Sequence, residues 1–199
     1  MRFVVTGTDT DVGKTVFCAG LAAMLGVRYW KPVQAGFPTD SQTVAALAGV
    51  EILPEAYRLK LAASPHQAAE DESITIDLDR LVPPQGPVVI EGAGGLMVPL
   101  TRQTLFIDVF ARWQIPLILC ARTRLGTINH TLLSIAAIRA HAIPLHGVAF
   151  IGEANDESER IITEIGQVKR LGRLPAIQPL SAERLAEIFS KAFQRADFA

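Results

Sequence analysis

The amino-acid sequence predicts an α/β fold in which a mostly parallel central sheet carries helices on both faces. Short apolar runs alternate with helical stretches along the chain, and this alternation is typical of parallel strands joined by crossover helices. Several of the runs are apolar without interruption, as expected for strands covered on both faces. Polar motifs directly follow these runs, so they are predicted to meet at the carboxyl edge of the sheet, where such folds bind ligands.

Composition and length restrict the function further. The 199 residues are enough for one domain, and we expect residues 1–199 to form a single nucleotide-binding unit. A net charge of −1 gives no electrostatic case for binding nucleic acid or an anionic membrane. Met1 and Arg2 lead directly into an apolar strand, so no signal peptide is expected, and Cys18 and Cys120 are predicted to be reduced core residues. We therefore expect a cytoplasmic enzyme.

The stretch from Gly7 to Thr15, Gly-Thr-Asp-Thr-Asp-Val-Gly-Lys-Thr, is the first motif and the one around which the rest is arranged. It lies between an apolar strand at residues 3–5 and a helix at residues 16–25, which is the setting of a phosphate-binding P-loop. A helix N-terminus attracts anions, Lys14 would reach the outer phosphates, and the Thr15 hydroxyl would bind Mg²⁺. Thr8 stands where the usual pattern has its first glycine. The alternative, an ordinary strand–helix turn, fits the flanking pattern less well, so a P-loop NTPase-type fold is predicted.

The remaining elements follow in order. We expect strands at residues 27–30, near 57–59, at 88–90, 116–121 and 145–151, and a short one before Gly172. Helices are expected at residues 44–48, 73–82, 104–113, about 129–141, 157–165 and 182–196, and residues 51–71 are expected to be otherwise irregular.

Two carboxylates are candidate metal ligands. Glu91 directly follows the apolar run at residues 88–90, where a nucleotide enzyme holds its metal, and a cap is the less favoured alternative. Asp40 could be a second ligand or simply the N-cap of the helix after it, and the sequence does not decide between them. Together with the Thr15 hydroxyl they would give the hard oxygen set that Mg²⁺ prefers.

Lys31, at the end of an apolar strand before Pro32, could stabilise charge on a transferring phosphoryl group, although strand-end lysines are usually surface residues. The glycine-rich stretch 92–95 could present amides to an anion or form a tight turn. Asn129 opens a predicted helix and is an N-cap by default, with amides beside it that could bind a carboxylate. The four histidines lack metal-ligand spacing and are taken as structural or solvated.

Taken together, the motifs resemble the dethiobiotin synthetase family, the ATP-dependent ligases of biotin synthesis. The resemblance runs from residue 1 to about residue 175. It rests on the P-loop at 7–15, Lys-Pro-Val-Gln at 31–34, Ser-Pro-His at 64–66, Glu-Gly-Ala-Gly-Gly-Leu at 91–96 with Val-Pro-Leu at 98–100, and Leu-Gly-Thr-Ile-Asn-His at 125–130.

The resemblance implies a reaction in which 7,8-diaminononanoate, CO₂ and ATP give dethiobiotin, ADP and phosphate through a carbamate and a mixed anhydride, with Mg²⁺ as cofactor. It also implies a homodimer, with the substrate carboxylate bound by the partner subunit. The implied roles are catalysis by Thr10, Lys14 and Lys31; nucleotide binding by Asp11, Val12, Gly13, Lys14, Thr15, Val16, Glu91, Gly92, Ala93, Gly94 and Pro175; substrate binding by Thr10, Asp11, Lys31, Ala35, Gly126 and Asn129; and metal binding by Thr15, Asp40 and Glu91.

The sequence departs from the family pattern at two positions. Ala35 stands where the lysine motif usually has a hydroxyl residue that contacts the substrate. Gly152 follows the strand at 145–151 where an asparagine usually reads the nucleotide base, and Asn155 lies nearby.

Two other classes share parts of this pattern. Partition and cluster-carrier ATPases carry a lysine early in the loop, where this chain has Asp9, Thr10 and Asp11, and an acidic loop suits an amine substrate better. Amidotransferase-linked synthetases of the cobyrinate type add a glutaminase domain, for which 199 residues leave no room. A pure binding module is the least favoured, because metal-binding oxygens and two lysines are predicted at one edge.

Overall fold

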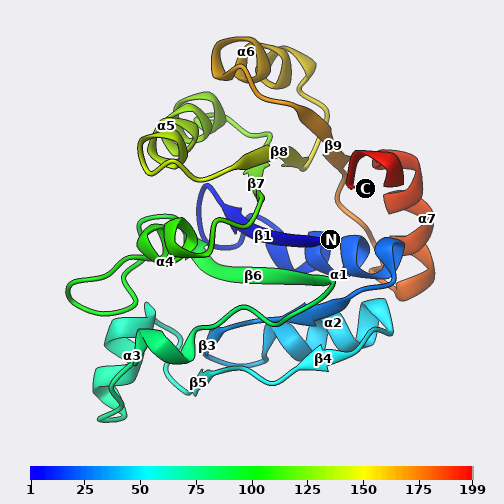
Figure 1. Cartoon of the computed structure of the whole chain (residues 1–199). Helices are drawn as coiled ribbons and strands as arrows, with labels where there is room; N and C mark the ends of the chain where they lie inside the picture. The colour runs from blue at the N-terminus through cyan, green and yellow to red at the C-terminus, as the bar shows by residue number, and fades with distance from the viewer. Residues whose placement is uncertain (199) are drawn as a thin grey trace.

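The computed structural model describes residues 1–198, and it has the predicted α/β architecture. One parallel sheet of seven strands runs in the order β4-β2-β6-β1-β7-β8-β9, so the chain crosses repeatedly from the centre toward both edges (Figure 1). The strands are β1 (Arg2–Gly7), β2 (Arg28–Trp30), β4 (Ile52–Leu53), β6 (Val88–Gly95), β7 (Leu117–Arg122), β8 (Leu145–Ile151) and β9 (Arg170–Leu174).

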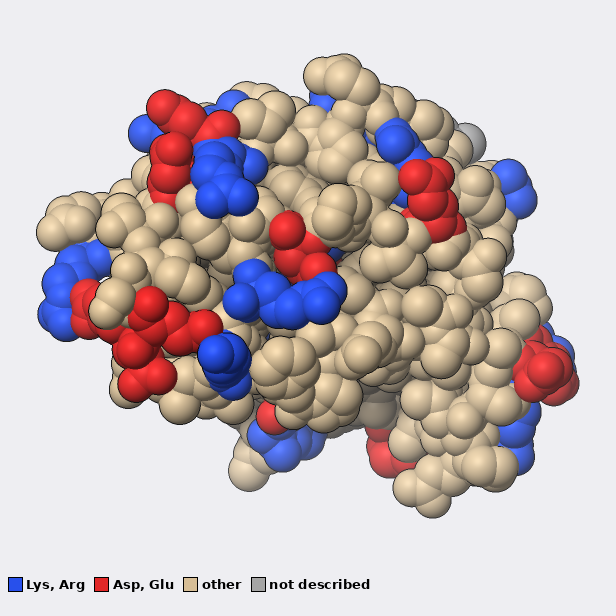
Figure 2. Space-filling view, turned by 90° about the horizontal axis from the view of Figure 1, so that it is seen from below, with Lys and Arg blue, Asp and Glu red and all other residues tan. Residues whose placement is uncertain are grey.

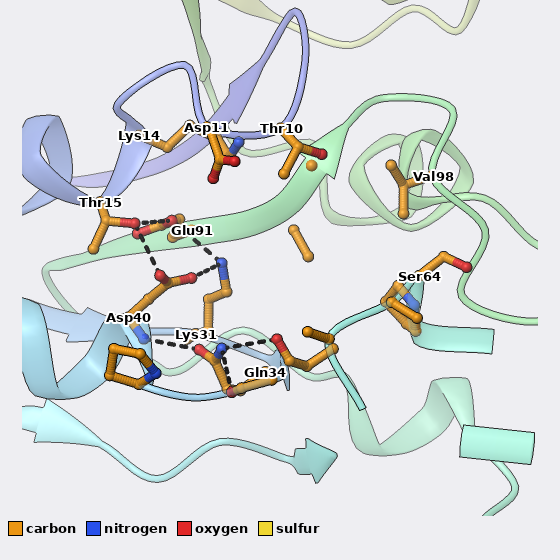
Figure 3. Close-up of a pocket in the computed structure, with 18 of the residues that line it drawn as sticks. Thr10, Asp11, Lys14, Thr15, Lys31, Gln34, Asp40, Ser64, Glu91 and Val98 are labelled. Atoms are coloured by element: carbon orange, nitrogen blue, oxygen red, sulfur yellow. Dashed lines mark hydrogen bonds and ion pairs between the residues drawn. The ribbon is translucent and has the colours of Figure 1, made fainter. Parts of the chain in front are cut away.

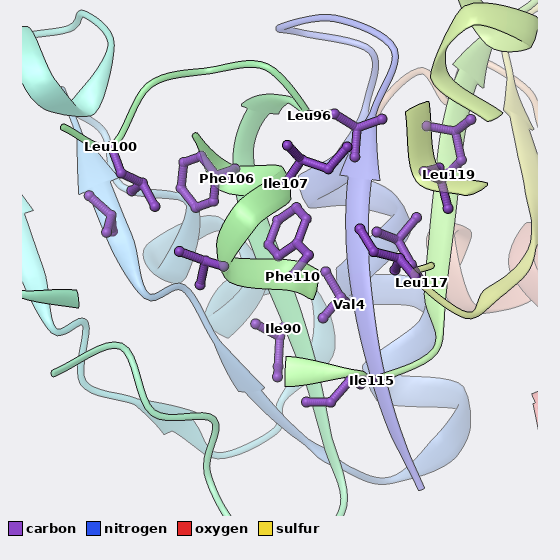
Figure 4. Close-up of a cluster of buried hydrophobic side chains, with 14 of the residues drawn as sticks. Val4, Ile90, Leu96, Leu100, Phe106, Ile107, Phe110, Ile115, Leu117 and Leu119 are labelled. Atoms are coloured by element: carbon purple, nitrogen blue, oxygen red, sulfur yellow. The ribbon is translucent and has the colours of Figure 1, made fainter. Parts of the chain in front are cut away.

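Helices cover both faces of this sheet, and each face has its own apolar core. Apolar side chains of α1, α2 and α7 pack on one face, and those of α3, α4, α5 and α6 pack on the other. Figure 4 shows the second core, in which Phe106 and Phe110 of α4 lie over Val4, Ile90 and Leu117 of the central strands. The helices are α1 (Lys14–Leu25), α2 (Asp40–Ala48), α3 (Pro65–Asp71), α4 (Phe106–Trp113), α5 (Thr127–Ala140), α6 (Asp156–Gly166) and α7 (Ala182–Ala192).

Residues 51–71 were predicted to be irregular apart from a strand near 57–59; that strand is confirmed, and the region has more structure besides. Besides β4 and α3, it contributes β5 (Tyr57–Leu59), which pairs in parallel with β3 (Val33–Ala35) in a separate two-stranded sheet. The proline at position 32 ends β2 as predicted, but the chain resumes an extended course one residue later. This small sheet holds residues 33–35, the segment that follows Lys31 and Pro32.

Two predicted helices differ from the structure. Residues 73–82 form only a short 3₁₀ turn at Leu78–Arg80, because the chain leaves α3 through a turn with Ser73 at φ 55° and Tyr57 Oη accepts the Asp77 amide hydrogen at 2.8 Å. The last helix ends at Ala192, before the predicted residue 196, because Phe193 turns extended and bridges to Gly172. A second 3₁₀ turn at Arg195–Phe198 follows, and residue 199 lies outside the described residues.

The exposed charges are mixed in sign. On the face shown in Figure 2, basic and acidic side chains lie side by side without a broad basic area. Within residues 1–198, no helix is long and apolar enough to cross a membrane. Cys18 and Cys120 are free thiols buried in the core, as predicted.

Candidate active site

The loop between β1 and α1 has the conformation that a phosphate-binding loop needs. Gly13 precedes α1 with φ of 99°, and a Cβ there would lie 2.8 Å from the Ile151 side chain, so only glycine fits. The first turn of α1 has no acidic residue and no side-chain cap. Its amides and the positive end of the helix dipole therefore face the cavity without a competing protein anion at the N-cap.

Lys14 is the first residue of α1 and is buried. Its ammonium donates a hydrogen bond to the Asp9 carbonyl at 3.1 Å, and that is its one recorded partner among residues 1–198. Burial lowers the pKa of Lys14; Glu91 opposes this shift and Lys31 adds to it. An anion bound in this loop would compensate a charge that the protein leaves largely unpaired.

Lys31 lies in a different environment, at the centre of a cluster of acceptors. Its ammonium is 2.6 Å from Asp40 Oδ2 and donates to Glu91 Oε1 and to the Gly92 carbonyl, both at 3.2 Å. Burial lowers the pKa of Lys31, but the two carboxylates outweigh it and leave that pKa above its usual value. The lysine is 2 % exposed, so the surface-residue alternative is wrong.

Asp40 reaches this cluster because another residue caps its helix. The sequence left open whether Asp40 is the N-cap of α2; the N-cap is Thr39, whose hydroxyl accepts from the Gln42 amide while Gln42 accepts from the Thr39 amide. The Gln34 side chain accepts the Asp40 amide hydrogen at 3.0 Å. The carboxylate of Asp40 is therefore free to point into the cavity.

Thr15, Asp40 and Glu91 bring three oxygens together. The Thr15 hydroxyl lies 3.1 Å from Asp40 Oδ1 and 2.9 Å from Glu91 Oε1 (Figure 3). Its single proton can serve only one carboxylate at a time, so a cation bound to the three oxygens would satisfy them better. This hard oxygen set fits Mg²⁺. Among the described residues, no cluster of three or more His, Cys, Asp or Glu side chains is arranged to hold a metal, and this set has two carboxylates and one hydroxyl.

These side chains line one cavity of about 750 Å³. Figure 3 shows Lys14, Thr15 and Glu91 along one side and Lys31, Asp40 and Gln34 on the other, with Ser64 and Val98 at the far end. Of the predicted site residues, the cavity wall includes Thr10, Asp11, Gly13, Lys14, Thr15, Val16, Lys31, Ala35, Asp40, Glu91, Ala93 and Gly94. Three chain-distant motifs therefore meet around one space.

The other predicted site residues are not among those that line this cavity. Val12 is buried beneath the loop, and Gly92 contributes its carbonyl to Lys31. Pro175, Gly126 and Asn129 are exposed elsewhere. The interpretation of Asn129 as an N-cap is wrong, because α5 begins at Thr127 with Gly126 as its cap and Asn129 lies in the first turn.

The structure explains the glycine at position 152. Its φ is 128°, and a Cβ there would lie 2.6 Å from the Thr123 hydroxyl oxygen. The nearby Asn155 side chain is engaged in the protein: its amide donates to the Thr123 carbonyl, and its oxygen caps α6 by accepting from the Ser158 amide.

Some of the site was not found from the sequence. Gln34 and Ser64 line the cavity, although both motifs were noted only as part of the resemblance. Tyr29, whose hydroxyl donates to Glu91 Oε2 at 2.8 Å, gave no sequence signal, because the contact depends on β2 lying next to β6.

Comparison with known proteins identifies the family. A family model described as an AAA domain matches residues 1–184. An ATP-dependent dethiobiotin synthetase of Agrobacterium fabrum is 60% identical and covers 100% of this chain and 97% of its own. One from Sphingopyxis alaskensis is 57% identical, covering 99% and 98%. The chain belongs to the ATP-dependent dethiobiotin synthetase family. This confirms the resemblance seen in the sequence and the prediction that the chain is an ATP-dependent ligase of biotin synthesis.

Solved structures confirm the P-loop fold. A ParA family ATPase from Chlorobium tepidum covers 96% of both chains with a TM-score of 0.58, and the MinD cell division protein of Aquifex aeolicus covers 93% of this chain and 86% of its own with 0.53. Both are only 11% identical, so they show a shared fold. The partition ATPases that the sequence left as an alternative therefore share the fold of this chain. The family is that of the dethiobiotin synthetases, which the relatives above show.

Proposed function

We propose that the cavity carboxylates and cyclises 7,8-diaminononanoate with CO₂ and ATP, giving dethiobiotin, ADP and phosphate. One observation supports this most: a single cavity brings together the P-loop, two lysines of unlike environment and three oxygens suited to a metal. A substrate amine takes up CO₂ as a carbamate, and a carbamate oxygen attacks the γ-phosphate to give a carbamic–phosphoric mixed anhydride. The second amine then attacks the carbonyl carbon, and the ring closes as phosphate leaves.

The protein residues act on charge and position in this scheme. Lys14 and the amides at the start of α1 bind the phosphates, together with backbone at residues 91–94. Lys31 lies across the cavity from the P-loop, where its ammonium stabilises the negative charge of the carbamate and of the transferring phosphoryl group. Thr10 and Asp11 face the cavity, where the acidic side chain suits a cationic amine.

Thr15, Asp40 and Glu91 hold Mg²⁺ in this proposal. The ion supplies charge neutralisation of the triphosphate. Asp40 starts α2 and Glu91 lies on β6, so the ligands come from both walls of the cavity.

Gly126 and Asn129 serve the partner subunit in this proposal, which assumes a homodimer in the cytoplasm. Both are exposed at the start of α5 and outside their own cavity, as a contribution in trans requires. A mixing experiment tests this. Lys31→Met and Asn129→Ala, each inactive alone, should regain activity when co-refolded, up to about a quarter of the sites if hybrids form at random. No recovery in verified heterodimers would contradict sharing.

The reaction itself is tested by labelled substrates. Phosphate release from ATP should require both the diamine and bicarbonate, and ¹³C from bicarbonate should appear in the ring carbonyl of dethiobiotin. With ¹⁸O-labelled bicarbonate, one labelled oxygen should appear in the released phosphate, because a carbamate oxygen leaves with it. ATP turnover that ignores the diamine would instead indicate a nucleotide switch.

A further inference from the structure

Tyr29 lies directly beneath Glu91 on the same face of the sheet. Tyr29 pairs with Val89 across β2 and β6, and because side chains alternate along a strand, residue 91 points to the same face. The Tyr29 ring is fully buried under α1, and its hydroxyl donates to Glu91 Oε2 at 2.8 Å.

The two oxygens of Glu91 therefore have separate partners. Oε1 faces the cavity, within hydrogen-bond distance of the Thr15 hydroxyl and the Lys31 ammonium. Oε2 points to the protein interior, where the Tyr29 hydroxyl donates to it, and the buried Cys18 thiol also lies close to the Glu91 carboxylate. The final torsion of a glutamate side chain is broad and roughly two-fold, so the Tyr29 bond to Oε2 fixes the plane of the carboxylate together with the contacts of Oε1.

We propose that Tyr29 is a positioning residue that fixes the Glu91 carboxylate for metal binding, an inference that rests on the proposed role of Glu91 as a Mg²⁺ ligand. Partners of a metal ligand orient it and keep it rigid, and their loss weakens metal affinity although they never touch the ion. Removing the Tyr29 hydroxyl leaves Oε2 buried without this donor. The carboxylate then reorients, and Oε1 no longer lies where it can bind a metal ion together with Thr15 and Asp40.

The chain provides a matched control, because it contains only two tyrosines. Tyr57 is also buried, but its hydroxyl accepts from the Asp77 amide at 2.8 Å instead of donating to Glu91. Tyr57→Phe thus removes the same hydroxyl from a buried, hydrogen-bonded tyrosine away from Glu91. A general loss of stability would affect both variants, whereas a positioning role affects only Tyr29→Phe.

The test measures how much Mg²⁺ strengthens nucleotide binding. A non-hydrolysable ATP analogue is titrated calorimetrically into each protein with Mg²⁺ and with EDTA, and the two Kd values are compared. In Tyr29→Phe the strengthening by Mg²⁺ should fall about tenfold, with the Kd in EDTA unchanged; Tyr57→Phe should match wild type. If Mg²⁺ does not strengthen binding to wild type, the proposed metal set fails. If it does and Tyr29→Phe keeps the full effect, only the positioning role fails.

A second measurement covers the case in which Tyr29→Phe does not fold. Tyr57→Phe protein labelled with 3-fluorotyrosine carries the label at position 29 alone. Its ¹⁹F resonance should shift when Mg²⁺ is added to the nucleotide-bound protein, and Glu91→Gln should abolish that shift. A resonance that does not respond to Mg²⁺, in protein whose nucleotide affinity does, would overturn the inference.

Discussion

Replacing Lys31 with methionine removes one buried ammonium while keeping most of the side-chain volume. In the structure this ammonium is shared by Asp40 at 2.6 Å, Glu91 at 3.2 Å and the Gly92 carbonyl at 3.2 Å. Removing one partner of a buried ion pair costs about 3–5 kcal/mol, and we take about 3 kcal/mol because Asp40 is partly exposed to solvent. For a chain of this length, that corresponds to a fall in Tm of about 6–12 °C.

The same substitution should affect catalysis more than binding. The P-loop amides and Lys14 remain, so nucleotide affinity should partly survive. Loss of a preorganised charge at the transferring group should lower turnover by about 10²–10³. Differential scanning calorimetry, nucleotide titration and dethiobiotin synthesis separate these effects. Lys191→Met, which removes an exposed lysine paired with Glu187, is the control and should leave all three unchanged. Turnover like that of wild type in Lys31→Met would refute the catalytic role.

The pH dependence of this variant has a defined sign. The folded pKa of Lys31 lies above the ordinary value of 10.5, so its stabilisation is present below that pH and is lost as pH rises through the folded pKa. The difference in Tm between wild type and Lys31→Met should therefore stay constant from about pH 7 to 9 and shrink above about 10.5. A difference that shrinks between pH 7 and 9 would contradict a raised pKa.

Three further substitutions test separate parts of the site. Lys14→Met should raise the Tm of the nucleotide-free protein, because burial disfavours that charge, while weakening nucleotide binding; a lower Tm with unchanged affinity would contradict this. Thr39→Ala should cost about 1 kcal/mol of stability through the lost cap of α2 and weaken Mg²⁺-dependent binding through Asp40, measured by denaturation and calorimetry. Gly152→Asn should lower stability by about 1–3 kcal/mol, because the new Cβ would meet the Thr123 hydroxyl. The preference for ATP over other triphosphates should stay unchanged.

The parts of the site at strand ends could be predicted from the sequence. An apolar run before Lys31 or Glu91 indicates where the polar residue lies, because the strands of the main sheet are all parallel. The predicted strand end at residue 90 is wrong, since β6 continues to Gly95 and Glu91 lies within it. Roles that depend on tertiary contacts could not. Asp40 is free for the cavity only because Thr39 caps α2, and Tyr29 contacts Glu91 only because β2 and β6 are neighbours. The helix predicted at residues 73–82 is wrong for a similar reason, a contact with Tyr57.

The most direct test of the account is the position of the metal in a crystal of the complex. Crystals grown with a non-hydrolysable ATP analogue, the diamine and Mn²⁺ in place of Mg²⁺ would locate the ion by its anomalous scattering. We expect it bound to the Thr15 hydroxyl and a phosphate oxygen, with Asp40 and Glu91 contacting it directly or through one water, and with the Lys31 ammonium facing the γ-phosphate. A metal and triphosphate bound outside this cavity would contradict the account.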